Sequence, residues 1–232
     1  MEAKIKNLFL ALGAVECGIA GIERFTDAPV DFHPRDIFPG CNSVIVFLVK
    51  LPFSLSGIDP GTVYTQANNM SLAELDRISF SGANLLDNMG YLSLPLPADG
   101  PYDYWDAQHL EGKGILSLRH AAQAAGLGSI GKNHLLLNKK YGSFVSIGAV
   151  LTSCSLISDQ PSTEICLPDC RLCLDNCPTQ ALVGQSTDQA RCRPHTYTKN
   201  ARGFDLCVCN TCRTICPSLK VARKNAQKKS TP

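Results

Sequence analysis

The sequence predicts an α/β domain followed by a small cysteine-rich module. Helix-like and strand-like patterns alternate from the N-terminus to about residue 153, as in proteins that pack helices on a sheet. Nine of the twelve cysteines then lie between Cys166 and Cys216. With 232 residues, of which 44% are hydrophobic, the chain is long enough for one medium domain and one small one. We therefore expect an α/β domain over residues 1–153, a cysteine-rich module over 154–217 and a basic tail over 218–232.

The first part of the chain contains the patterns of one helix and two strands. Residues 5–12 are expected to form a helix that ends at Gly13, and residues 15–20 a short strand. Residues 26–42 contain three prolines and are expected to form a loop. Residues 44–49 form a continuous run of β-branched and aromatic side chains between breakers, which is typical of a buried central strand.

The middle of the domain contains two further helical patterns. Ser71 and Glu74 match a capping box, in which each side chain bonds the other residue's backbone N–H group. A helix is therefore expected to begin at Ser71 and to end at Gly90. We also expect a strand over residues 91–94, an alanine-rich helix over 115–125, and strands over 134–138 and 143–152.

The charges are spread unevenly along the chain. The net charge is +2, yet the last fifteen residues contain five basic side chains and no acid: Lys220, Arg223, Lys224, Lys228 and Lys229. The remainder is therefore mildly acidic and lacks a basic surface of the size that nucleic-acid binding usually needs. We expect no nucleic-acid partner.

The N-terminus does not predict export or a membrane anchor. Lys4 and Lys6 precede an apolar run over residues 8–12, but this run is short and Glu16 follows it closely. The sequence contains no apolar run of transmembrane length. We expect an amphipathic first helix, no membrane association and a cytoplasmic location.

The cysteine spacing indicates metal binding rather than a disulfide framework. Disulfide scaffolds are short chains, whereas here the cysteines crowd into one segment of a longer chain. Two cysteine runs each end in Cys-Pro, at Cys177-Pro178 and at Cys216-Pro217. In ferredoxins with two [4Fe–4S] clusters, the cysteine before such a proline ligates the other cluster. The pattern predicts a ferredoxin-like module with two [4Fe–4S] clusters.

This crossed pattern assigns ligands to each cluster. The first cluster takes three cysteines of the first run and one of the second: Cys166, Cys170, Cys173 and Cys216. The second cluster takes Cys177, Cys209, Cys212 and either Cys192 or Cys207.

We favour Cys192 for the last position. Cys207 is one residue from Cys209, so both side chains would have to turn to the same side of an alternating backbone. The first run departs from the ferredoxin spacing, because three rather than two residues separate Cys166 from Cys170, and Cys154 is a distant substitute for Cys166. A structural zinc held by Cys170, Cys173, Cys209 and Cys212 is the alternative.

A glycine-rich turn follows the alanine-rich helix. It does not match the P-loop pattern, and it precedes a strand rather than a helix. Its glycines would allow the backbone to approach a cofactor closely, with the lysine near a phosphate or carboxylate. The candidate cofactor-binding residues are Gly126, Gly128, Ser129, Ile130, Gly131, Lys132 and Asn133. The alternative is a helix C-cap followed by a tight turn.

Residues 95–114 are rich in proline, glycine and aromatic side chains. A loop this long inside a domain is usually functional or disordered, and the aromatic residues argue against disorder. We expect it to line a substrate site in which Tyr104 or His109 donates a proton. The alternative is a loop that packs its aromatic side chains on the sheet.

Several of these segments resemble epoxyqueuosine reductases. The glycine turn from Ala125 to Asn133 matches the central segment of that family, as do Tyr141-Gly-Ser-Phe144 and residues 147–152. Residues 39–46, 173–182, 190–192 and 209–217 are also similar to the corresponding parts of the family. The resemblance covers most of the chain and is most specific over residues 125–217.

The resemblance implies a nitroreductase-like α+β domain beside two [4Fe–4S] clusters, an arrangement also found in the related reductive dehalogenases. It implies that residues 126–133 line a cobalamin and that the clusters pass electrons to its cobalt. FMN is the fallback cofactor. The resemblance supports Cys192 over Cys207 as a ligand. It also suggests a low-potential electron donor, such as ferredoxin or flavodoxin, and a homodimer.

Two departures from the family shape the expected function. The stretch Gly112-Lys-Gly-Ile-Leu116 stands where the family has a catalytic acid, with Glu111 beside it. The family's C-terminal helical repeats have no counterpart before residue 232. We therefore expect a short, divergent iron–sulfur reductase that lacks this acid and reduces a small organic molecule. The alternative is a non-catalytic electron-transfer protein or a reductive activator of a corrinoid protein.

Overall fold

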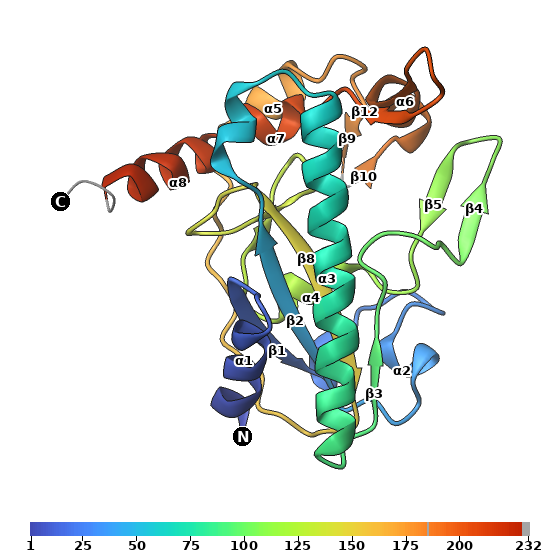
Figure 1. Ribbon diagram of the computed structural model, residues 1–232, viewed down its shortest axis with the longest axis vertical. Helices are drawn as coiled ribbons and strands as arrows, with labels where there is room; N and C mark the ends of the chain where they lie inside the picture. The colour runs from blue at the N-terminus through green and yellow to red at the C-terminus, as the bar shows by residue number, and fades with distance from the viewer. Residues whose placement is uncertain (185, 229–232) are drawn as a thin grey trace.

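The centre of the computed structural model is an antiparallel sheet with helices on both faces (Figure 1). The structure describes residues 1–184 and 186–228. The sheet has four strands in the order β1-β2-β8-β3, and each neighbouring pair is antiparallel. Their bounds are β1 Glu16–Gly21, β2 Ser43–Lys50, β8 Val145–Thr152 and β3 Ser93–Pro95.

Strand β2 is buried on both faces, as its unbroken apolar run predicts. Val44, Val46 and Leu48 point to one face of the sheet and pack with the short helix α4 (Leu118–Ala124). Ile45 and Phe47 point to the other face. Alternate residues of a strand face opposite sides, so a strand covered on both sides needs apolar residues at every position.

The second face of the sheet is covered by two helices (Figure 1). Helix α1 (Glu2–Ala11) contributes Ile5 and Phe9, and the long helix α3 (Thr62–Asn88) contributes Leu75, Ile78 and Leu86. Helices on both faces of one sheet confirm the predicted mixed α/β fold.

The predicted start of helix α3 at Ser71 is wrong, because the helix begins at Thr62. Ser71 is buried in the helix and donates its hydroxyl proton to the carbonyl of Asn68 at 2.8 Å. Its Oγ also lies 3.2 Å from Oγ of Ser146 on β8. A serine inside a helix commonly bonds a carbonyl of the preceding turn. The local pattern of a capping box therefore did not mark a helix start here.

Part of the expected loop over residues 95–114 forms a hairpin. Strand β4 (Tyr104–Asp106) pairs with β5 (Glu111–Lys113), with Trp105 opposite Gly112. Each strand has three residues, too few for a period-two pattern to stand out in the sequence. In Figure 1 this hairpin extends from the body beside the cysteine-rich module.

The cysteine-rich module consists of short elements connected by turns. They are α5 Leu172–Asp175, β9 Leu182–Val183, β10 Ser186–Thr187, α6 Gln189–Thr196, β11 Tyr197–Lys199, β12 Asp205–Cys207 and α7 Thr211–Thr214. The remaining short elements of the chain are η1 Ile22–Phe25, α2 Pro34–Ile37, η2 Phe53–Gly57, β6 Ser129–Ile130 and β7 Leu136–Leu137.

The segment expected as a basic tail contains a packed helix, α8 (Pro217–Lys228). Its Leu219 is buried in an apolar cluster with Leu51, Leu55, Tyr64 and Phe144. Residues 229–232, including Lys229, lie outside the described residues. Because α8 shares this cluster with the α/β domain, it ties the C-terminal part of the chain to the sheet.

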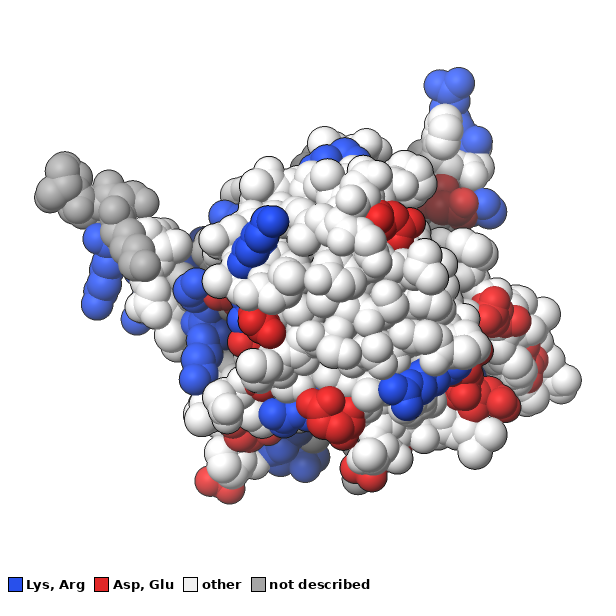
Figure 2. Space-filling model, turned by 90° about the horizontal axis from the view of Figure 1, so that it is seen from below, with Lys and Arg blue, Asp and Glu red and all other residues white. Residues whose placement is uncertain are grey.

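Charged side chains are scattered over the lower end of the molecule, as it is oriented in Figure 1. Figure 2 shows Lys and Arg interspersed with Asp and Glu on this face, around a broad uncharged area. Within residues 1–184 and 186–228, no helix is both long enough and apolar enough to span a bilayer.

Candidate functional site

Four cysteines from two distant segments line one pocket. They are Cys166, Cys170, Cys173 and Cys216, which were predicted to ligate the first cluster. Cys173 lies on α5, and Cys216 immediately precedes α8. Burial raises the pKa of the Cys173 thiol, and the neighbouring thiols of Cys166, Cys216 and Cys170 raise it further. The fold thus brings these four thiols together across a sequence separation of 50 residues.

A second group of cysteines surrounds Cys212 on helix α7. Burial raises the pKa of Cys212 to about 11, with a further rise from the thiols of Cys192, Cys209 and Cys177 and an opposing effect from Arg213. Cys192 comes from helix α6 and Cys177 follows α5. These four cysteines are the set that was predicted for the second cluster.

Cys207 also lies close to this second group. Its thiol donates a hydrogen bond to the carbonyl of Cys209 at 3.6 Å, and its backbone N–H donates to Oγ1 of Thr65 at 2.8 Å. Burial raises the pKa of Cys207, and the thiols of Cys209 and Cys192 add to the rise. The choice of Cys192 over Cys207 therefore stays a prediction.

The donor chemistry of both groups fits iron–sulfur clusters. The thiol of Cys177 accepts a hydrogen bond from the N–H of Ala181 at 3.3 Å. Burial raises the pKa of Cys177, but hydrogen bonds from Ala181 and Thr179 outweigh burial and lower it overall. Hydrogen bonds of this kind stabilise the thiolate form that binds iron.

Asn210, between Cys209 and Cys212, also fits a bound iron–sulfur cluster. Its side chain is 8% exposed, and its Nδ2 atom makes no hydrogen bond of normal geometry among the described residues, although it lies close enough to the Tyr64 hydroxyl to lower the pKa of that group. A buried donor without a partner is costly, so an acceptor such as a cluster sulfur atom would stabilise this side chain.

Among residues 1–184 and 186–228, no group of three or more His, Cys, Asp or Glu side chains is arranged to hold a single metal ion. The thiolates of a zinc site all lie about 2.3 Å from one ion. The four thiolates of a cubane cluster each bind a different iron and therefore stand further apart.

The glycine turn packs against the protein's own backbone. A Cβ atom on Gly128 would lie 2.1 Å from the carbonyl oxygen of Leu137, and one on Gly126 would lie 2.2 Å from that of Gln160. Gly126 also has a φ of +72°, which favours glycine. At these two positions, glycine leaves room for carbonyl groups of the protein itself, whereas the sequence suggested room for a cofactor.

The polar residues of the turn contact the segments that carry the cysteines. Ser129 donates its hydroxyl proton to Oε1 of Glu164 at 2.9 Å, and Asn133 donates from Nδ2 to the carbonyl of Cys212 at 2.9 Å. Lys132 donates to three carbonyl groups between Cys166 and Cys173. Ile130 pairs with Leu136, and Gly131 donates its N–H to the carbonyl of Leu135 at 2.9 Å. A role of residues 126–133 in binding a corrinoid stays a prediction.

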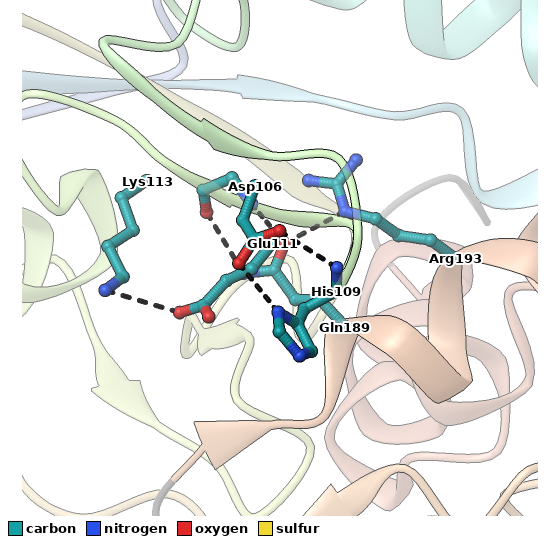
Figure 3. A network of polar contacts seen from close by, with 7 residues as sticks. Asp106, His109, Glu111, Lys113, Gln189 and Arg193 are labelled. Atoms are coloured by element: carbon teal, nitrogen blue, oxygen red, sulfur yellow. Dashed lines mark hydrogen bonds and ion pairs between the residues drawn. The ribbon is translucent and has the colours of Figure 1, made fainter.

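The two candidate proton donors lie on the β4–β5 hairpin. Nδ1 of His109 lies 2.7 Å from Oδ2 of Asp106, and this hydrogen bond raises the pKa of His109 and lowers that of Asp106 (Figure 3). The N–H groups of Gln108 and His109 also donate to Asp106. Tyr104 packs with Lys113, whose ammonium lies 4.8 Å from the ring centre. Asp106 thus fixes the orientation of an exposed imidazole.

No sequence pattern indicated that helix α6 contacts this hairpin. The side-chain amide of Gln189 makes two hydrogen bonds with the backbone of Gly112, at 3.0 and 3.1 Å. The guanidinium of Arg193 lies 5.0 Å from the ring centre of Trp105 and 5.5 Å from that of Tyr102. Figure 3 shows Gln189 and Arg193 reaching from α6 toward the hairpin. Cys192, a predicted cluster ligand, lies on the same helix.

The comparisons with known proteins confirm the resemblance to epoxyqueuosine reductases. No protein-family model matches the chain. The chain is 38% identical over 114 residues to an epoxyqueuosine reductase of Staphylococcus aureus, covering 45% of this chain and 30% of that protein. It is 29% identical over 217 residues to that of Gloeobacter violaceus, covering 88% of this chain and 65% of that protein. The chain therefore spans about one third to two thirds of the length of these relatives.

Solved structures share the fold. One is a reductive dehalogenase whose structure suggests a mechanism for B12-dependent dehalogenation. It matches with a TM-score of 0.69 and 20% identity, over 98% of this chain and 34% of that one. An epoxyqueuosine reductase in complex with an epoxyqueuosine-modified tRNA-Tyr stem loop matches with a TM-score of 0.63 and 18% identity, over 94% of this chain and 65% of that one.

This second structure corrects the expectations about partners. A protein of this fold binds a tRNA stem loop, so the expectations of no nucleic-acid partner and of a small-molecule substrate are wrong. The error came from using net charge as a measure of RNA binding. Proteins that bind RNA loops contact unpaired bases by stacking and hydrogen bonds as well as phosphates, so a mildly acidic body does not exclude RNA.

Proposed function

We propose that this chain is an iron–sulfur reductase that carries electrons through two [4Fe–4S] clusters to a cobalamin in the α/β domain. The observation that best supports the proposal is the convergence of eight cysteines into two groups of four, each drawn from distant segments. Short Cys-x-x-Cys spacing supplies part of each set, and the fold places Cys216 beside the first run and Cys177 beside the second, as crossed ligation requires.

In this proposal the protein holds and tunes the clusters. Cys166, Cys170, Cys173 and Cys216 hold the first, and Cys177, Cys192, Cys209 and Cys212 hold the second. The clusters supply single-electron transfer when bound. The chain's own contributions are burial of Cys173 and Cys212 and the N–H donor of Ala181, which set the local polarity around the sulfur atoms.

The hairpin supplies the proton that a reduction requires. Asp106 binds Nδ1 of His109, which leaves Nε2 of the imidazole as the atom that can give up a proton to a substrate. Tyr104, on the same hairpin, is a second candidate donor. The likeness to the B12-dependent reductive dehalogenase supports cobalamin as the cofactor, with FMN as the fallback.

The stem-loop complex of a protein with this fold makes an RNA-borne nucleoside the first substrate to test.

The alternative function, electron transfer or reductive activation of a corrinoid protein, is favoured by one observation. By the resemblance, residues 112–116 stand where epoxyqueuosine reductases have their catalytic acid, and this chain has only Gly, Lys, Ile and Leu there. The neighbouring Glu111 pairs with Lys113 at 3.4 Å.

Iron analysis tests the cluster assignment. The anaerobically reconstituted protein should contain about eight iron atoms per chain and show the visible absorption of [4Fe–4S] clusters. Cys192→Ala should lose about half of the iron, whereas Cys207→Ala should retain it. The opposite pair of results would make Cys207 the ligand, and iron well below eight in the parent protein would refute the two-cluster assignment.

Cofactor binding tests the reductase function. Cobalamin added to the reconstituted protein should bind at micromolar concentrations and be reduced when electrons are supplied to the clusters. A protein that keeps both clusters but binds neither cobalamin nor FMN would favour the electron-transfer alternative.

A further inference from the structure

Lys132 binds the cysteine loop with all of its hydrogen-bond donors. Its Nζ atom donates to the carbonyl groups of Cys170 at 3.0 Å, Leu167 at 3.4 Å and Pro168. A lysine ammonium has three N–H donors, so these three acceptors use its full capacity. Lys132 therefore has no donor left for the phosphate or carboxylate that the sequence suggested.

The bound loop is the one with unusual spacing. Three residues, Leu167, Pro168 and Asp169, separate Cys166 from Cys170, whereas the bacterial ferredoxin spacing has two. All three are exposed. The extra residue lengthens the backbone between two cysteines that must reach the same cluster. Two of the three carbonyl groups that Lys132 binds belong to this longer loop.

Lys132 also lines the pocket formed by the first group of cysteines. It comes from the α/β domain, and the adjacent Asn133 binds the carbonyl of Cys212 in the second cysteine run. The glycine turn thus contacts both cysteine runs, and its lysine brings a positive charge to the first.

We propose that Lys132 is a positioning residue for the first cluster, which holds the long 167–169 loop so that Cys166 and Cys170 reach the same cluster as Cys173 and Cys216. The inference rests on the proposed two-cluster function. Because the loop is one residue longer than in bacterial ferredoxins, the lysine is needed to hold it during cluster assembly. Its charge also favours the reduced, more negative cluster and so raises the midpoint potential.

Substitution of Lys132 tests the proposal through cluster content. In Lys132→Met, the iron content should fall from about eight to about four per chain, because only the first cluster is lost. Lys132→Arg should retain most of the iron, since a guanidinium keeps the charge and has five N–H donors. Lys139→Met is the matched control, because Lys139 is exposed and lies outside this pocket. Electron paramagnetic resonance of the reduced proteins would show which cluster remains.

A second variant separates loop positioning from a general effect on folding. Deletion of Pro168 restores the two-residue spacing, so Lys132→Met in this shortened chain should again hold about eight iron atoms. Loss of the first cluster in the shortened chain as well would overturn the positioning role.

The outcomes also distinguish this inference from the proposed function. A parent protein with two clusters, and a Lys132→Met variant with the same iron content and midpoint potentials, would overturn the inference and leave the function intact. A parent protein that binds no clusters would overturn both.

Discussion

At the scale of the residue, burial sets the charge of His134. This side chain follows the glycine turn and is 7% exposed. Its Nδ1 atom lies 2.9 Å from Oγ1 of Thr187, and Nε2 lies 3.4 Å from the carbonyl of Gly184. Burial lowers the pKa of His134 from its ordinary 6.5, the charge of Arg119 adds to this effect, and the carbonyl of Gly184 opposes it. The folded protein therefore keeps the imidazole neutral down to a lower pH than the unfolded chain does.

This lowered pKa predicts a pH-dependent loss of stability. Below pH 6.5 the unfolded chain binds a proton at His134 that the folded chain does not, so the free energy of unfolding falls as the pH drops from 6.5 toward the lowered folded pKa. Above pH 6.5 the effect is absent. His134→Gln should reduce this slope, as measured by urea unfolding at several pH values. His195→Gln, at an exposed position, is the control.

The pH dependence of stability should not vanish completely in His134→Gln. Burial also lowers the pKa of His120, so part of the slope should survive in His134→Gln. An unchanged slope in the variant would show that His134 binds its proton equally well in both states.

At the scale of the element, helix α6 and the β4–β5 hairpin form one unit. Gln189 and Arg193 lie four residues apart and therefore on the same side of the helix, where both meet the hairpin. Tyr102 and Trp105 stack with their ring centres 6.1 Å apart, and Arg193 contacts both rings. The helix that carries Cys192 thus also positions the hairpin that carries His109.

Arg193→Ala should loosen the hairpin. The substitution removes cation–π contacts and the hydrogen bond to Tyr102, a loss of about 1–2 kcal/mol of local stability. Since about 1.4 kcal/mol is a tenfold change in an equilibrium constant, amide hydrogen exchange over residues 104–113 should speed up roughly tenfold. Arg191→Ala is the matched control, because Arg191 lies on the same helix and pairs with Asp188. Equal exchange rates in the two variants would contradict the coupling.

At the scale of the whole molecule, the chain has contacts that join its two parts. Leu219 of α8 packs with Leu51, Leu55, Tyr64 and Phe144 from the α/β domain. The segment that connects the sheet to the cysteine runs also contacts the edge strand β1. Its Asp159 accepts a hydrogen bond from the N–H of Ile19 at 2.9 Å. We therefore expect the two parts to unfold together.

Leu219→Ala should destabilise the whole molecule. A buried leucine replaced by alanine typically costs about 2–5 kcal/mol, and Leu219 is 1% exposed. Denaturant unfolding followed by circular dichroism would measure this loss. Val221→Ala on the same helix, where the side chain is 56% exposed, should cost little. Equal costs for the two substitutions would show that α8 does not stabilise the fold through this cluster.

Local patterns in the sequence determined several features of the protein. The apolar run of residues 44–49 predicted the central strand, because a strand covered on both faces needs apolar side chains throughout. The two Cys-Pro runs predicted that Cys216 lies near the first run and Cys177 near the second, because crossed ligation joins the two runs, and the fold places these thiols side by side. The ligand sets themselves stay a prediction. The resemblance to epoxyqueuosine reductases also came from short runs of residues.

Tertiary structure alone decided what the side chains between these patterns contact. Ser71 matched a capping box but lies within helix α3, which begins at Thr62 and buries Tyr64 of its first turn against Leu51 and Phe144. The partners of Lys132 are 35 to 38 residues away, and Arg193 meets Tyr102 across 91 residues. Contacts at such separations leave no local pattern, so the sequence placed Lys132 near a cofactor, and only the fold shows it on the loop between Cys166 and Cys170.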